Sequence, residues 1–246
     1  MDMSTLSYPH ALLFDLDGTL LLEKEPAEQC WKKACIPFAH LVDAKALFQA
    51  LLHADALRKE RIKDHPEKQR RERLDPSVAR KEQAALALHH LGADVSLTDQ
   101  LVQEFERHRE QRELAPGADE TLQKLQQLGI RLALLTNGNA TYQRRKLQRF
   151  QLGSFFSLIL IEEETGSAKP EPSAYSGALT RLQLQPSHVW MVGDNLELDI
   201  AAPQRLGLSA IWYDREAQGL PLASLVQPNA IIHALPDVLS LLEASR

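Results

Sequence analysis

The sequence predicts an α/β protein in which helices cover both faces of a doubly wound parallel sheet and a helical bundle is inserted after the first strand. Two observations lead to this prediction. Short apolar runs typical of buried strands alternate with stretches of helical periodicity along residues 116–246. Between the first apolar run and the second, residues 23–115 carry only helical spacing. A chain of 246 residues, 44% of them hydrophobic, is long enough to bury such a core.

The first predicted strand covers residues 11–14, an apolar run that ends at Asp15. About four helices are expected from residue 26 to residue 114, because side chains such as Leu47, Phe48 and Leu51 recur at helical spacing. Farther along, strands are predicted over residues 130–135, 158–161, 189–192, 210–213 and 231–232, and helices over residues 122–128, 142–150, 173–182, 200–206 and 238–244. Since Pro203 lacks a backbone N–H, the helix that contains it is expected to begin late.

These elements predict two domains. Residues 1–22 and 116–246 form the α/β core, and residues 23–115 form the inserted helical domain. Because the insert follows the first strand, we expect it over the carboxyl ends of the strands, where such sheets bind ligands. It would then act as a lid.

The composition limits the cellular compartment and the classes of binding partner that we expect. The net charge of −5 favours neither nucleic acid nor an anionic membrane surface. The only cysteines, Cys30 and Cys35, are expected to be helix packing residues, and their low number fits a reducing compartment. No apolar run is long enough to span a bilayer, and the first ten residues lack the features of a signal peptide. We therefore expect a cytoplasmic protein without nucleic-acid or membrane partners, and both a monomer and a homodimer are open.

Two carboxylates, Asp15 and Asp17, follow the first predicted strand, and Gly18 comes next as a turn residue. On an extended chain, side chains two residues apart point the same way, so these two negative charges repel each other. A proton or a hard cation is the usual means of neutralising such a pair. The segment is therefore the strongest candidate for a catalytic site in this sequence, the alternative being an acidic surface turn.

The segment Asp15-Leu16-Asp17-Gly18-Thr19-Leu20 resembles the first motif of the haloacid dehalogenase-like hydrolases. Three later segments resemble the other motifs of this family, in the same order: Leu134-Leu135-Thr136-Asn137-Gly138, Lys169-Pro170-Glu171-Pro172, and Val192-Gly193-Asp194-Asn195 with Asp199 beyond it. The resemblance runs from about Leu12 to Tyr213. It implies a Rossmann-like core, with residues 23–115 similar to the family's α-helical cap.

The resemblance also implies a role for each matching residue. Asp15 would attack phosphorus and form an aspartyl phosphate, and Asp17 would act as general acid and then as general base. Mg²⁺ would be held by the carboxylates of Asp15 and Asp194 and by the backbone carbonyl of Asp17. The remaining roles are phosphate binding by Thr136, Asn137, Gly138 and Lys169, with Thr136 and Lys169 also catalytic, and support of the metal ligands by Asp199 and Asn195.

These roles predict a Mg²⁺-dependent phosphatase for a small phosphorylated metabolite, such as a nucleotide, a flavin-pathway compound or a sugar phosphate. Asp17 argues against the dehalogenase branch, which has no acid at this position because a halide leaves without a proton. A phosphomutase and a non-catalytic binding protein on the same fold are the alternatives. Residues 58–82 of the insert are net basic, with ten Lys or Arg and six Asp or Glu. This stretch is either a surface that guides an anionic substrate or a solvated helix face.

Overall fold

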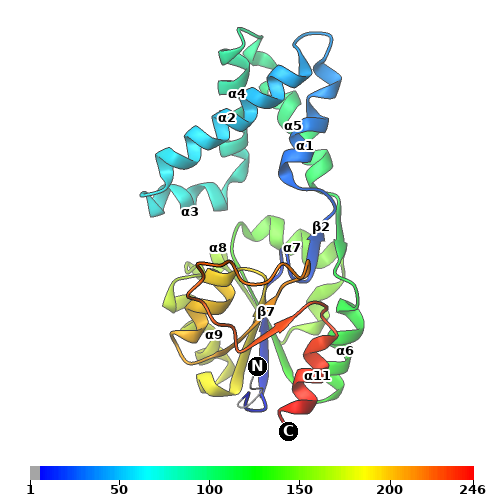
Figure 1. Cartoon of the computed structure of the whole chain (residues 1–246), viewed down its shortest axis with the longest axis vertical. Helices are drawn as coiled ribbons and strands as arrows, with labels where there is room; N and C mark the ends of the chain where they lie inside the picture. Colours follow the sequence, from blue (N-terminus) through cyan, green and yellow to red (C-terminus); the bar gives the residue numbers. More distant parts are fainter. Residues whose placement is uncertain (1–5) are drawn as a thin grey trace. The chain divides into compact units, whose positions relative to one another are not determined.

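The computed structural model describes residues 6–246, which form two compact units (Figure 1). One unit runs up to Leu22 and resumes at Leu114, and the other runs from Glu23 to Glu113. The first boundary predicted from the sequence, after residue 22, is the same as in the structure. The second was predicted at residue 116, two residues after the observed boundary at Leu114.

The first unit contains a six-stranded sheet in the order β5-β4-β1-β6-β7-β8. Every pair of neighbouring strands is parallel, so the predicted parallel sheet is confirmed. The strands are β1 (Ala11–Phe14), β4 (Arg131–Thr136), β5 (Leu158–Ile161), β6 (Val189–Gly193), β7 (Ser209–Tyr213) and β8 (Ala230–Ile232). Counted along the chain, this order is that of a doubly wound sheet, in which the direction of winding reverses between β1 and β6.

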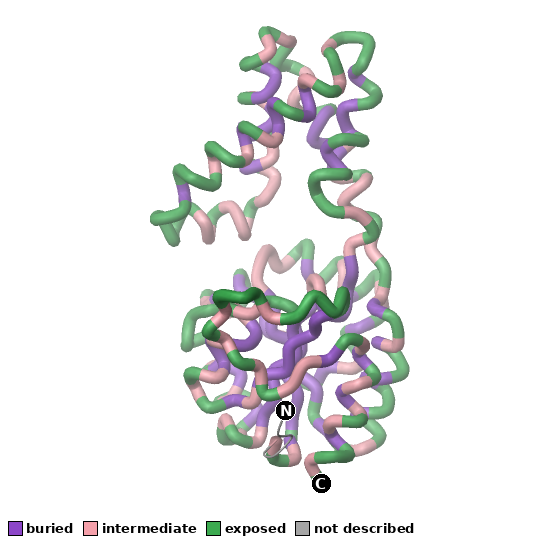
Figure 2. Tube along the Cα trace, viewed as in Figure 1, coloured by how far each residue is buried: buried purple, intermediate pink, exposed green. Residues whose placement is uncertain are grey.

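Helices cover both faces of this sheet, as predicted. They are α6 (Ala118–Gln127), α7 (Ala140–Arg149), α8 (Glu162–Thr165), α9 (Pro172–Leu182), α10 (Ala202–Gln204) and α11 (Asp237–Ala244). In Figure 1, α9 lies on one side of the sheet and α6 and α11 lie on the other. Figure 2 shows the buried residues of this unit gathered along the strands between them.

Alternation along the central strands decides which side chains face which helices. Leu12 and Phe14 belong to the core cluster that includes residues of α6, α7 and α11. Ala11 and Leu13 belong to the cluster that includes residues of α9. The residue after Phe14 therefore points towards the α9 side.

The segment around Pro203 differs from the prediction of a late helix start. Residues Leu196–Ala201 form a π-helical turn that continues directly into α10. Pro203 cannot donate a backbone hydrogen bond, and in a regular α-helix its ring would clash with the carbonyl of Asp199. A wider π turn before it allows the chain to become helical immediately after the fourth motif.

The second unit is a helical bundle. Its helices are α1 (Ala27–Ala34), α2 (Ala44–Ile62), α3 (Pro66–Leu74), α4 (Pro76–His90) and α5 (Thr98–Arg109). There is one α-helix more than expected, because α3 has no buried residue and therefore gives no periodic apolar signal. The core of the bundle includes both cysteines, which are buried thiols, and the rings of Trp31 and Phe105, which stack with centroids 4.1 Å apart.

A short two-stranded sheet, formed by β2 (Leu21–Glu23) and β3 (Arg112–Leu114), was not predicted. It pairs the two chain segments that connect the units. Among the described residues, no helix combines the length and the apolar composition needed to cross a bilayer.

Candidate active site

The strand order brings three of the predicted site residues to one edge of the sheet. β1 lies between β4 and β6, and Phe14 is in register with both Leu134 and Val192. Asp15 directly follows β1, Thr136 is the last residue of β4, and Asp194 directly follows β6. Segments more than a hundred residues apart in the chain thus meet at adjacent carboxyl ends, where sheets of this type bind ligands.

Lys169 joins two carboxylates on the α9 side of the sheet. Its Nζ donates to Asp15 Oδ1 at 2.6 Å and to Asp199 Oδ1 at 2.7 Å. The three side chains are almost completely buried, with exposed fractions of 2% for Lys169, 10% for Asp15 and 1% for Asp199. Lys169 lies just before α9, and Asp15 points to this side because it continues the Ala11–Leu13 alternation.

Asp194 completes the acidic cluster. One carboxylate oxygen from each of Asp15, Asp194 and Asp199 lies within 4.8 Å of the others. Asp194 is held by two contacts: Thr19 Oγ1 donates to its Oδ1 at 3.0 Å, and Trp212 Nε1 donates to its backbone carbonyl at 2.8 Å. Gly18 lets the first motif approach this closely, because its φ is +92° and an added Cβ would lie 2.5 Å from Asp194 Oδ2.

The pKa values reflect this crowding of negative charge. Burial raises the pKa of Asp15 to about 7, although Lys169 opposes the rise. Burial, reinforced by the charge of Asp15, raises the pKa of Asp194 to about 6. Burial also raises the pKa of Asp199. Burial alone would lower the pKa of Lys169, but the charges of Asp15 and Asp199 outweigh it and raise that pKa.

These residues fit a hard divalent cation. Three carboxylates face a single ammonium group, so the cluster carries excess negative charge. Both oxygens of Asp199 already accept hydrogen bonds, from Lys169 and from the Asn195 N–H. This leaves Asp15 and Asp194 as the better carboxylate ligands, and oxygen is the ligand atom that Mg²⁺ prefers.

Asn195 and Gly193 hold Asp199 in this position. The Asn195 side chain caps the π-helical turn by accepting from the N–H groups of Glu197 and Leu198, both at 3.0 Å. Its own N–H donates to Asp199 Oδ2 at 3.0 Å. An added Cβ at Gly193 would lie 2.3 Å from Asp199 Cγ, so only glycine leaves room for this carboxylate.

The second motif is arranged on the α7 side. Leu132 and Leu134 belong to the cluster shared with α7, and Thr136 continues their alternation. The Asn137 side chain clamps the backbone of Lys169, accepting from its N–H at 2.8 Å and donating to its carbonyl at 2.7 Å. The backbone N–H of Gly138, expected to bind phosphate, instead donates to Glu162 Oε2 at 2.9 Å.

The Asp17 carboxylate contacts α7, and its charge contributes to the raised pKa of Asp15. Asp17 accepts from Lys146 Nζ at 2.9 and 2.7 Å and from Gln143 Nε2 at 3.0 Å. Both partners lie on α7. The ammonium of Lys146 thus neutralises the charge of this carboxylate.

The structure thus brings together Asp15, Asp194, Asp199 and Lys169, with Asn195 and Asn137 supporting them. Sequence reasoning missed several residues that contact the predicted site residues, among them Thr19, Gln143, Lys146, Glu162 and Trp212. Thr19 belongs to the first motif, but it was assigned no role from the sequence. Nothing in the sequence distinguishes Gln143 and Lys146 from the exposed polar residues of the same helix.

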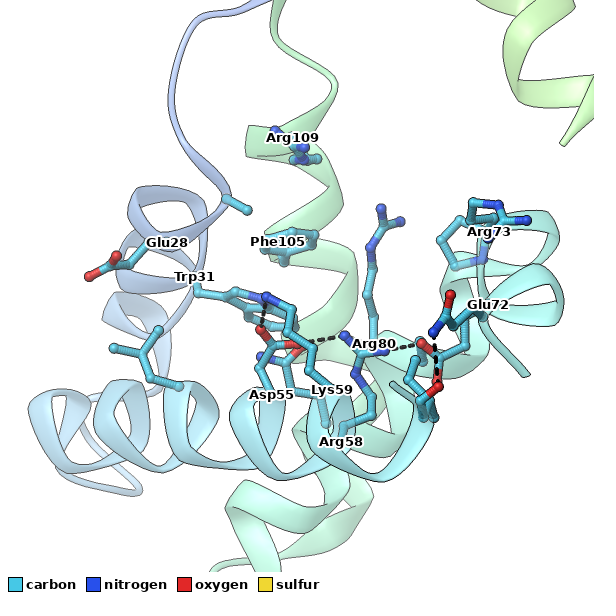
Figure 3. Close-up of a pocket in the computed structure, with 17 residues that line it drawn as sticks. Glu28, Trp31, Asp55, Arg58, Lys59, Glu72, Arg73, Arg80, Phe105 and Arg109 are labelled. Carbon is cyan, nitrogen blue, oxygen red and sulfur yellow. Dashed lines mark hydrogen bonds and ion pairs between the residues drawn. The ribbon is translucent and has the colours of Figure 1, made fainter. Parts of the chain in front are cut away.

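The helical unit contains a cavity of about 610 Å³ (Figure 3). Its lining includes the stacked Trp31 and Phe105 and several basic side chains. Arg58 is ion-paired with Asp55 and Glu72 in this lining. Many basic residues of the stretch 58–82 have ion-pair partners, among them Arg58, Lys59, Arg61, Lys63, Arg80 and Lys81. Most of the positive charge there is therefore locally neutralised.

Comparison with known proteins agrees with this geometry. The family model for haloacid dehalogenase-like hydrolases matches residues 9–207. Two curated relatives are a ribulose-1,5-bisphosphate 5-phosphatase of Halopiger xanaduensis, 41% identical over 43% of this chain, and a phosphoserine phosphatase of Thermus thermophilus, 37% identical over 52%. The matches span 44% and 52% of those two proteins, about half of their length.

Two solved structures match over nearly the whole chain. A 2-haloacid dehalogenase of Pseudomonas syringae is 27% identical, with a TM-score of 0.67 over 97% of this chain and 100% of that one. The protein YfnB of Bacillus subtilis, crystallised with magnesium, is 23% identical, with a TM-score of 0.70 over 96% and 99%. The order of the four motifs, the sheet that presents them and the family match lead to one conclusion: the chain belongs to the haloacid dehalogenase-like hydrolases.

Proposed function

We propose that the protein is a Mg²⁺-dependent phosphatase that hydrolyses a small phosphorylated metabolite through an aspartyl phosphate on Asp15. One observation carries the proposal: Lys169 bridges Asp15 and Asp199 beside Asp194, so one ammonium and three carboxylates meet at the strand ends. A divalent cation would offset the excess negative charge of this cluster and give an anionic phosphoryl group a positive partner. The phosphatase names of the two curated relatives support the reaction class.

Bound Mg²⁺ would neutralise charge on the phosphoryl oxygens and keep the carboxylate ligands ionised. Asp15, Asp194 and the backbone carbonyl of Asp17 are the residues that would hold it. Since the reaction is mostly positioning and charge neutralisation, the fixed ammonium of Lys169, which donates to Asp15 Oδ1, would serve the same purpose.

In the first step, the oxygen of Asp15 that is not bonded to Lys169 attacks phosphorus, and the ester P–O bond breaks. Asp17 gives its proton to the departing alkoxide oxygen. The Thr136 hydroxyl binds a phosphoryl oxygen. The product alcohol leaves, and an acyl phosphate stays on Asp15.

In the second step, Asp17, now a carboxylate, removes a proton from a water molecule, and that water attacks the same phosphorus atom. The bond between phosphorus and Asp15 breaks, and inorganic phosphate is released. Both starting groups are regenerated, because Asp15 recovers its carboxylate and Asp17 recovers its proton.

A second candidate, a hydrolytic dehalogenase, draws support from the 27% identity to the Pseudomonas syringae dehalogenase. Asp17 argues for the phosphatase. An alkoxide is a poor leaving group without a proton, whereas a halide needs none, so an acid beside the nucleophile is useful only in phosphate transfer. A mutase would return the phosphoryl group to a bound acceptor and form a bisphosphate during turnover.

The test is hydrolysis of p-nitrophenyl phosphate and of a panel of nucleotide, flavin-pathway and sugar phosphates, with Mg²⁺ and with EDTA. We expect turnover only with the metal. Asp15→Asn should lower kcat by at least about 10³-fold, because it removes the nucleophile. Asp119→Asn, which changes an exposed acid on α6, is the matched control and should retain activity. Full activity of Asp15→Asn, or chloride release from a 2-haloacid without phosphate release from the panel, would refute the proposal.

A further inference from the structure

A partly buried polar network on α7 links Asp17 to Thr136. Gln143 and Lys146 lie one helical turn apart and therefore on the same face of α7. Gln143 Nε2 lies 2.7 Å from Thr136 Oγ1, 3.0 Å from Asp17 Oδ2 and 2.9 Å from the Asn137 carbonyl. Lys146 Nζ donates to both oxygens of Asp17.

Lys146 determines which way the Gln143 amide points. Its Nζ also donates to Gln143 Oε1 at 2.6 Å. An ammonium group can only donate, so the amide oxygen must face Lys146 and the amide NH₂ must face the acceptors. The two hydrogens of the NH₂ are thereby shared among the Asp17 carboxylate, the Thr136 hydroxyl and the Asn137 carbonyl.

The Thr136 hydroxyl is oriented in turn. Its oxygen accepts from Gln143 Nε2, and its own hydrogen has only a long contact with the Asn137 carbonyl, at 3.4 Å. This hydrogen is therefore available for a stronger acceptor, such as a phosphoryl oxygen.

Polar side chains on a surface helix usually point into solvent, and neither Gln143 nor Lys146 does so. Gln143 is 3% exposed, and Lys146 is 20% exposed although a lysine on a helix can readily extend into water. By contrast, Arg144 of the same helix is 48% exposed and pairs with Glu164 at the surface. Burying an amide and an ammonium costs free energy unless they are fully hydrogen-bonded, and here both are.

We propose that Gln143 and Lys146 are positioning residues, which hold the Asp17 carboxylate and the Thr136 hydroxyl in register with the phosphoryl group. The inference rests on the proposed function, because it takes the roles of Asp17 and Thr136 from it. Lys146 fixes Asp17 directly and fixes Gln143 through its amide oxygen. Gln143 donates to both Asp17, the proposed acid and base, and Thr136, the proposed phosphate-binding residue.

Formation and hydrolysis of the phospho-enzyme can be measured separately, and a positioning role should affect them differently from a general structural role. p-Nitrophenolate leaves with little help from an acid, so the first step with p-nitrophenyl phosphate depends weakly on Asp17. Hydrolysis of the phospho-enzyme needs Asp17 as a base. In Lys146→Met we expect the first equivalent of p-nitrophenol to appear at a rate within about threefold of wild type, while steady-state turnover falls about tenfold or more. Phospho-enzyme should accumulate and be detectable after acid quench.

Gln143→Met should show the same burst and a further defect. Because Thr136 loses its orienting donor, inhibition by orthovanadate should weaken about fivefold, the equivalent of one hydrogen bond. Lys146→Arg retains a cation and donors and should restore at least part of the steady-state rate. Arg144→Met, which removes a charge from the exposed face of α7, should match wild type in both phases.

The proposal is overturned if Lys146→Met and Gln143→Met slow both phases by the same factor, or if Arg144→Met produces the same burst. Lys146→Gln repeats the comparison with a side chain that tolerates burial through hydrogen bonds, in case the methionine variant does not fold. If the wild-type protein forms no phospho-enzyme, the proposed function itself is wrong. That result is distinguishable, because it is measured before any variant is compared.

Discussion

Replacing Lys169 with methionine tests the charge balance on which the site depends. Lys169→Met removes the ammonium while keeping a chain of similar shape. The side chains of Asp15 and Asp199 are left facing each other at exposed fractions of 10% and 1%, without the donor that now lies 2.6 and 2.7 Å from them. Two buried carboxylates that face each other without a positive charge between them are among the least favourable arrangements in a protein interior.

The expected cost is large. Removing one partner of a buried ion pair typically lowers the free energy of unfolding by about 3–5 kcal/mol, a substantial part of the roughly 5–15 kcal/mol that stabilises a typical protein. Both carboxyl groups have raised pKa values even with Lys169 present, and Lys169 is the strongest influence that lowers them. Without it, their pKa values should rise further.

The direction of the pH dependence follows from this shift. In the folded variant the two carboxyl groups bind protons that the unfolded chain, with ordinary carboxyl pKa values, has already released. Stability is therefore highest at acidic pH and falls as the pH rises through the folded pKa values. We expect Lys169→Met to differ least from wild type near pH 5 and most near pH 8.

Urea unfolding in EDTA, followed by circular dichroism at pH 5 and pH 8, measures this effect. Lys124→Met changes an exposed lysine of α6 and should alter stability by no more than about 0.5 kcal/mol. A loss below about 1 kcal/mol for Lys169→Met at pH 8, or an equal loss at both pH values, would refute the reasoning, since a buried unpaired charge cannot be so inexpensive.

Two other predictions follow from the same geometry. Gly193→Ala should lower kcat at least about tenfold and destabilise the protein by about 1–3 kcal/mol, because the added Cβ would lie 2.3 Å from Asp199 Cγ. Melting temperatures and kcat of wild type and variant measure both effects. A variant with unchanged activity would contradict the prediction. Mg²⁺ should raise the melting temperature more at pH 7.5 than at pH 5.5, because its ligands Asp15 and Asp194, with pKa values of about 7 and 6, must first lose their protons. A thermal-shift titration at both pH values measures this, and equal shifts would count against these two residues as the ligands.

Much of the core could be predicted from the sequence because its strands are buried on both faces. Such strands are continuous apolar runs in the sequence, and these runs located all six strands of the sheet to within one residue at each end. The helix α3 could not be found in this way, since none of its residues is buried. The π-helical turn was missed for another reason: Pro203 signalled a disruption but not the local geometry that accommodates it.

The candidate site likewise contains residues that the sequence could predict and residues that it could not. Asp15 and Asp194 directly follow buried strands, and Asp17 lies two residues after Asp15, so the sequence alone predicts where they lie. Gln143 and Lys146 lie on a helix whose residues are nearly all polar. Periodicity cannot tell which of its polar positions faces a carboxylate, because that depends on how α7 packs against β1 and β4 and not on any local pattern.

Alternation in the central strands also explains why the site has two separate halves. Asp15 follows the residues that face α9, and there Lys169 neutralises it. Thr136 follows the residues that face α7, and there Gln143 binds it. The groups that manage charge on the nucleophile and the groups that manage proton transfer therefore belong to opposite faces of one sheet. Changes on the α9 face should act mainly on nucleophile charge and stability, and changes on the α7 face mainly on proton transfer, while the Asn137 side chain, which bonds to the Lys169 backbone, links the two sets.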